Sequence, residues 1–102
     1  MKFFLLLFLT QIAVAADLSS VDQKIRAGDF KAAKMALAGG TDFETLWRLS
    51  RIEVFEADKL SDPAAKEAGY TRALELAKKT IAAAPKESHG YLRLATAAGK
   101  IA

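Results

Sequence analysis

The spacing of apolar residues constrains this chain more than any other feature. From about residue 20 onward, apolar side chains recur every third or fourth position, and no stretch alternates apolar and polar residues in the manner of a strand. Glycine and proline separate the periodic segments, at Gly28, at Gly39-Gly40 and at Pro85. The pattern predicts an all-α fold in which helices joined by short turns form antiparallel hairpins.

Residues that cap helices bound the first half of this pattern. Residues 20–23 have the Ser-x-x-Gln form of a capping box, in which a hydroxyl and an amide satisfy free backbone N–H groups of the first turn. A second capping box at residues 41–44 predicts a helix that runs to about Lys59. Between them, Asp29 is placed to cap a helix that ends at the Gly39-Gly40 pair.

The second half is predicted to contain one long helical segment and one final helix. The Ser-Asp-Pro sequence at 61–63 favours a helix start, because the missing N–H of proline costs nothing at the first helical position. The segment runs to Ala84, either as one long helix or as a broken pair of helices with the break expected at Gly69. The last helix is predicted from near Ser88 onward.

The first sixteen residues have the pattern of a secretory signal peptide. Lys2 supplies a positive charge, residues 3–9 are all apolar, and Ala13-Val14-Ala15 fits the small-residue rule for cleavage, with Val14-Ala15-Ala16 fitting nearly as well. The apolar stretch is shorter than the roughly 20 residues that a bilayer-spanning helix needs. We therefore expect residues 1–16 to be removed on export to the periplasm or the exterior, which leaves a helical domain at 17–102.

Composition narrows the function classes. The chain has no Cys and a single His, so we expect no disulfide, no thiolate zinc site and no His-rich metal site. Its charge of +3 is mild and the two signs are interspersed, which argues against a nucleic-acid partner. We find no Gly-rich phosphate loop and no nucleophile–base motif in the sequence. The prediction is a protein that is not an enzyme and uses no cofactor.

Two parts of the chain repeat one another. An aromatic residue is followed by Ala three positions later and by an apolar residue after four more. The first instance is Phe30, Ala33 and Leu37, and the second is Tyr70, Ala73 and Ala77. Trp47-Arg48-Leu49 is echoed by Tyr91-Leu92-Arg93-Leu94. Such spacing suits paired helices, because the small residue permits close approach while the aromatic residue fills the groove.

These positions resemble the tetratricopeptide repeat and, more specifically, the regulator of microtubule dynamics family. The residues that carry the resemblance are Trp47, Tyr70, Ala73, Ala77, Thr80, Pro85, Tyr91, Leu94 and Ala95, while Ser50 departs from the expected Ala. The resemblance implies an α-solenoid of about two and a half repeats and, for bacterial-type members, an exported or membrane-associated protein. A plain repeat has about 34 residues, but the numbers of Trp47 and Tyr91 differ by 44. The excess is expected as a longer turn at 60–68.

A repeat protein of this kind is expected to be a scaffold. We predict a non-catalytic interaction module of the cell envelope that docks a peptide or a partner helix on its concave face. The alternative for the two arginines nearest Trp47 is that they only balance acidic residues of the same helix surface. The candidate partner-binding residues are Arg48, Arg51, Phe55 and Arg93.

The last helix carries apolar residues on too many sides for a polar cap. Either the chain belongs to a longer repeat protein, or this helix packs on a second copy in a homodimer. The candidate self-association residues are Leu92, Leu94 and Ile101.

Core roles are expected for the aromatic residues at repeat positions, Trp47, Tyr70 and Tyr91. The lone His89 is expected to pack near a helix start beside Tyr91, since a single imidazole rarely makes a metal site. Two other function classes stay open. A membrane-surface helical protein would use basic residues of the long helix, and a small hydrolase would depend on His89 or Glu53.

Overall fold

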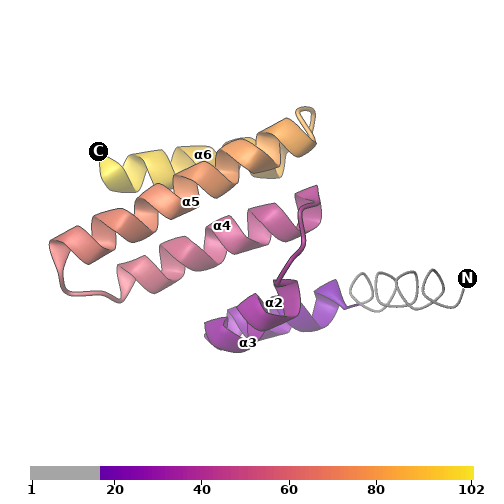
Figure 1. Cartoon of the computed structure of the whole chain (residues 1–102), viewed down its shortest axis with the longest axis horizontal. Helices are drawn as coiled ribbons and strands as arrows, with labels where there is room; N and C mark the ends of the chain where they lie inside the picture. Colours follow the sequence, from indigo (N-terminus) through magenta and orange to yellow (C-terminus); the bar gives the residue numbers. More distant parts are fainter. Residues whose placement is uncertain (1–16) are drawn as a thin grey trace, which may run out of the picture. The chain divides into compact units, whose positions relative to one another are not determined.

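The computed structural model describes residues 17–102, and all of its secondary structure in that range is helical (Figure 1). The predicted signal peptide, residues 1–16, lies outside the described residues. The helices are α2 (Leu18–Arg26), α3 (Phe30–Leu37), α4 (Phe43–Asp58), α5 (Pro63–Ala83) and α6 (Ser88–Ile101). The predicted all-α class is confirmed. Within residues 17–102 no helix combines the length and the apolar character needed to cross a membrane.

The chain divides into two compact units, the first ending at Ala38 and the second comprising Gly39–Ala102. In the first unit, α2 and α3 form a hairpin that contains four buried apolar side chains, those of Val21, Ile25, Ala33 and Leu37. Gly28 in the connection has a φ of 80°, which favours glycine. Asp29 caps α3 as predicted, since its side chain accepts the N–H of Ala32 at 3.3 Å.

In the second unit, α5 packs against both α4 and α6, and α4 also contacts α6. Figure 1 shows that α4 and α6 run in the same direction while α5 runs opposite to both. The core of this unit lies where the three helices meet, around Val54, Ala57, Tyr70, Ala73 and Ala97. Small residues dominate the contacting side of α5, so its neighbours approach closely.

Of the two alternatives for the long segment, the single helix is confirmed and the break at Gly69 is wrong, because α5 is continuous from Pro63 to Ala83. Gly69 is buried inside it, and a Cβ at this position would lie only 2.7 Å from the Cβ of Ala57 on α4. Glycine is therefore present for the close approach of two helices and not to end one. A glycine in a helical sequence pattern is compatible with both roles.

The predicted long turn at 60–68 is also wrong. Only residues 59–62 separate α4 from α5, and Asp62 caps α5 by accepting the N–H of Ala65 at 2.9 Å. The residues in excess of a plain repeat extend the helices, since α4 has 16 residues and α5 has 21. The start at Pro63 agrees with the sequence prediction.

Neither capping box forms. Helix α2 begins at Leu18, ahead of Ser20, because Leu18 continues the apolar stripe of the helix; Ser20 Oγ instead accepts from Lys24 Nζ at 2.6 Å. Helix α4 begins one residue later than expected, with Asp42 at its N-cap, and the carboxylate of Asp42 accepts the hydroxyl of Thr45 at 2.6 Å. Local side-chain pairs replace the predicted backbone caps.

Ser50 and Tyr91 show how the packing departs from the repeat pattern. Ser50 is fully buried, and its hydroxyl donates to the carbonyl of Ala73 on α5 at 2.8 Å, so a polar residue is accommodated in the core. Tyr91 was expected in the core but is 49% exposed, and its hydroxyl donates to the Pro85 carbonyl at 2.8 Å.

Candidate functional site

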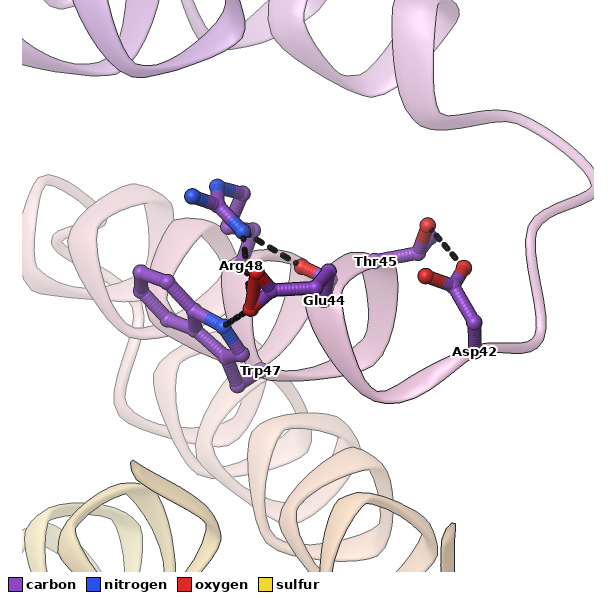
Figure 2. A network of polar contacts seen from close by, with 5 residues as sticks. All are labelled: Asp42, Glu44, Thr45, Trp47 and Arg48. Carbon is purple, nitrogen blue, oxygen red and sulfur yellow. Dashed lines mark hydrogen bonds and ion pairs between the residues drawn. The ribbon is translucent and has the colours of Figure 1, made fainter. Parts of the chain in front are cut away.

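Trp47 is held in place by residues of its own helix (Figure 2). Its indole N–H donates to a carboxylate oxygen of Glu44 at 2.9 Å. The guanidinium of Arg48 lies 4.2 Å from the centre of the indole ring, and its Nη1 donates to the Glu44 carbonyl at 2.9 Å and pairs with the Glu44 carboxylate at 3.5 Å. Spacings of three and four positions on one helix bring these three side chains together. Trp47 is consequently held in one position by its own helix.

The indole of Trp47 also contacts α6. The ring centres of Trp47 and His89 are 4.5 Å apart, and Phe43 approaches His89 edge-on with ring centres 6.3 Å apart. The structure thus packs His89 against Trp47 on α4, where the sequence led us to expect Tyr91 as its neighbour. His89 itself is exposed at the first turn of α6.

One turn further along α4, Arg51 lies near Arg93 of α6. The guanidinium carbon of Arg51 is 5.2 Å from the ring centre of Phe55, a cation–π contact within one helix. Partial burial, together with the nearby charge of Arg51, lowers the pKa of Arg93 from its ordinary value. The Nε of Arg93 is buried and has no hydrogen-bond partner among residues 17–102.

Trp47, Arg51 and Phe55 are four positions apart, and so are His89 and Arg93, so each set forms one stripe along its helix. The two stripes lie side by side, because Trp47 contacts His89 and Arg51 lies near Arg93. In both pairs the residue numbers differ by 42, so the two helices keep one register. We call these five residues the α4/α6 face. Within it, Arg51 and Arg93 are called the arginine pair.

At the C-terminal end of α4, Asp58 contacts both neighbouring helices, α5 and α6. Asp58 accepts the hydroxyl of Tyr70 at 2.5 Å and pairs with Lys100 of α6 at 3.1 Å; these three residues form the Asp58 cluster. Burial alone would raise the pKa of Asp58, but the hydrogen bonds from Tyr70 and Lys100 and the charges of Lys100 and Lys66 outweigh it. The pKa of Asp58 is therefore lowered.

The acidic side of α4 pairs with α5 as well as within its own helix. Glu53 pairs with Arg72 at 3.2 Å, across a hollow that Glu75 and Lys79 also line. Arg48 pairs with Glu44 of its own helix. For Arg48, this agrees with the alternative that the arginines near Trp47 balance acidic residues of the same helix surface. Arg51 has no carboxylate partner among residues 17–102.

The predicted partner-binding residues therefore separate into two kinds. Arg48 is buried at 7% exposure and engaged by Glu44 and Trp47, whereas Arg51, Phe55 and Arg93 are only partly buried and lie together on the α4/α6 face. Their role in binding stays a prediction.

Among the predicted self-association residues, Leu92 is 53% and Ile101 is 39% exposed, while Leu94 is half-buried. Self-association also stays a prediction. Both exposed side chains belong to α6.

The sequence did not reveal that the rings of Phe43 and Trp47 both contact His89. It also did not reveal that Glu44 holds the indole of Trp47. The available signal was the three-residue spacing of Glu44 and Trp47; nothing local connected His89 with Trp47. Within residues 17–102, no group of three His, Asp or Glu side chains could hold a metal ion.

Comparisons of the chain with family models, curated proteins and solved structures found no match. The resemblance to tetratricopeptide repeats therefore stays a prediction, and the functional argument rests on the geometry.

Proposed function

We propose that this protein is a non-catalytic interaction module of the cell envelope that docks a peptide or a partner helix on the α4/α6 face. The supporting observation is that this face collects aromatic and arginine side chains from two helices. Trp, Phe and Arg are enriched at the centres of protein interfaces, because they combine a large contact area with directed hydrogen bonding.

The fixed position of Trp47 favours this role. Its indole is only 8% exposed and is held by Glu44 and Arg48 of the same helix and by His89 of α6. It is therefore a fixed support for the more exposed side chains of the face. A surface that is already ordered loses less conformational entropy when a partner binds. Arg51 is restrained in a similar way by its contact with Phe55.

The tetratricopeptide-like arrangement belongs to the same proposal. Two consecutive helical hairpins would place their first helices side by side and in the same direction, and the parallel course of α4 and α6 beside α5 supports this (Figure 1). The location in the envelope is supported by the signal-peptide pattern of residues 1–16.

Site-specific photo-cross-linking in the organism that makes the protein tests the proposal. A benzoyl-phenylalanine at Phe55 keeps the first aromatic ring, adds the photoreactive benzoyl group and reports on the α4/α6 face, and the same group at the exposed Lys78 of α5 is the control. We expect a discrete adduct from position 55 that is absent from position 78. Equal labelling at both positions, or none at position 55, would contradict the proposal.

A further inference from the structure

The arginine pair places two like charges side by side without a compensating acid. Elsewhere in residues 17–102, cations of α4, α5 and α6 have carboxylate partners: Arg48 pairs with Glu44, Arg72 with Glu53 and Lys100 with Asp58. Neither Arg51 nor Arg93 pairs with a carboxylate in that range. Two adjacent positive charges repel each other, and the repulsion increases when they are partly removed from water.

The hydrogen-bonding state of Arg93 adds a second, independent observation. A guanidinium has five N–H donors in a planar fork, and the buried Nε of Arg93 has no acceptor in the described part of the chain, residues 17–102. Buried donors in proteins nearly always have a partner. A group that supplied both a negative charge and acceptor oxygens would satisfy Arg93 and remove its repulsion with Arg51.

From these observations we infer that the arginine pair is a site for a carboxylate side chain of an acidic peptide. The inference rests on the proposed docking function and names the chemistry that the α4/α6 face recognises. A carboxylate matches the guanidinium fork, because its two oxygens accept parallel hydrogen bonds from one arginine or bridge two.

The surroundings favour a peptide over a phosphate-bearing polymer or a membrane. Phe55 beside Arg51 is only partly buried and offers apolar surface for the rest of a peptide. Binding to nucleic acid or to anionic lipid relies on many unpaired basic residues spread over a surface. Here the basic residues Arg72, Lys78 and Lys100 each pair with an acid, and the chain carries a charge of only +3.

Two blocked peptides of equal length test the inference, one alternating Glu with Ala and one alternating Gln with Ala. Binding to the purified protein is followed through the arginine Nε–H signals in NMR spectra and by calorimetry. We expect the Glu peptide to bind at least about tenfold more tightly than the Gln peptide, which is the difference expected for hydrogen bonds to a charged group. The affinity should fall as salt is added.

Single substitutions locate the site. Arg51→Gln and Arg93→Gln should each weaken binding of the Glu peptide by about tenfold or more. Arg72→Gln removes the same charge from an exposed arginine that already pairs with Glu53, and it should leave the affinity within about twofold. Circular dichroism of each variant establishes that the helices are intact.

The outcomes separate this inference from the proposed function. Equal binding of both peptides, or equal losses in all three variants, overturns the carboxylate site. Preferential binding of inorganic phosphate or of phosphatidylglycerol vesicles, lost in the Arg51 and Arg93 variants, also overturns it in favour of a phosphate group. If the Phe55 adduct persists while the Glu peptide fails to bind, the inference fails and the docking function stands. If benzoyl-phenylalanine at position 55 gives no discrete cross-linked adduct, the docking function itself is overturned.

Discussion

The arginine pair and the Asp58 cluster form where the same two helices run side by side, yet their electrostatics are opposite. Lys100 and Asp58 differ in number by 42, as Arg93 and Arg51 do, so both sites follow one parallel register of α4 and α6. At Asp58 an acid accepts a hydroxyl and pairs with an ammonium group; at the arginine pair two cations meet. The first site joins α4 to α5 and α6 through opposite charges and a hydrogen bond, whereas the second leaves a buried N–H of Arg93 without an acceptor among residues 17–102. A charged pair is therefore not evidence of stabilisation until the signs and partners are known.

The largest effect is expected from removing the side chain that joins the helices at the arginine end. Trp47→Ala should lower the free energy of unfolding by about 3 kcal/mol, since it deletes a buried indole together with its contacts to Arg48 and His89. Urea unfolding followed by circular dichroism measures the change. Tyr91→Ala, at the equivalent repeat position but half exposed, is the control and should cost much less. Equal losses of unfolding free energy in the two variants would show that Tyr91 is as important to the core as Trp47, as the repeat pattern predicts and the observed burial does not.

The Asp58 end depends on the close approach of α4 to α5. Gly69→Ala should destabilise the protein by about 2 kcal/mol, because the added Cβ would lie 2.7 Å from that of Ala57 and force the helices apart. Gly99→Ala in α6 is the matched control. A Cβ there meets nothing within 4 Å, so the variant should gain up to about 1 kcal/mol from helix propensity. The same unfolding measurement compares the two, and stabilisation by both would contradict the tight contact.

At the arginine pair we expect a substitution to stabilise the protein, in contrast to Trp47→Ala and Gly69→Ala. Arg93→Met should raise the free energy of unfolding by about 1 kcal/mol, because it removes a partly buried cation, its unsatisfied donor and its repulsion with Arg51. Thermal unfolding at low salt measures the gain, which should shrink at high salt as the repulsion is screened. A loss of stability would mean that Arg93 contributes more through the packing of its aliphatic stem than it costs through its charge.

The smallest effect is a pH dependence confined to the Asp58 cluster. The pKa of Asp58 is lower in the folded protein than in an unfolded chain, so its contribution to stability is present above about pH 4 and is lost as the pH falls through the folded value. Urea midpoints measured between about pH 6 and pH 3 should therefore fall less in Asp58→Asn than in the unaltered protein. Identical slopes would show that Tyr70 and Lys100 do not favour the ionised form of Asp58.

Much of the fold was predictable because helices leave local signals. The apolar spacing and the glycine and proline positions identified every helix of residues 17–102, and Asp29 and Pro63 marked two starts correctly. The errors occurred where one local pattern permits two structures. Gly69 satisfied the pattern of a break as well as that of a close contact, and only the presence of Ala57 opposite it decides between them.

The candidate site was less predictable, because its members come from helices that are not consecutive. Arg51, Phe55 and Arg93 were identified as partner-binding candidates, but the sequence aligned Trp47 with Tyr91, a separation of 44, while the side chains that meet differ by 42. That shift of two residues brings His89 and not Tyr91 against Trp47. Repeat alignment compares equivalent positions in a pattern, whereas contact depends on how far each helix is displaced along its axis.

By itself the sequence determined that residues 17–102 form helices and approximately where each begins and ends, because apolar periodicity, proline and helix caps act over a few residues. It also supplied an N-terminal pattern that predicts export. Only the tertiary structure decided which charges compensate each other. Arg48 meets Glu44 through the four-residue spacing of one helix, but only packing pairs Arg72 with Glu53 and sets Arg93 beside Arg51. Electrostatic energy depends on distance and burial in space, and neither is encoded by position along the chain.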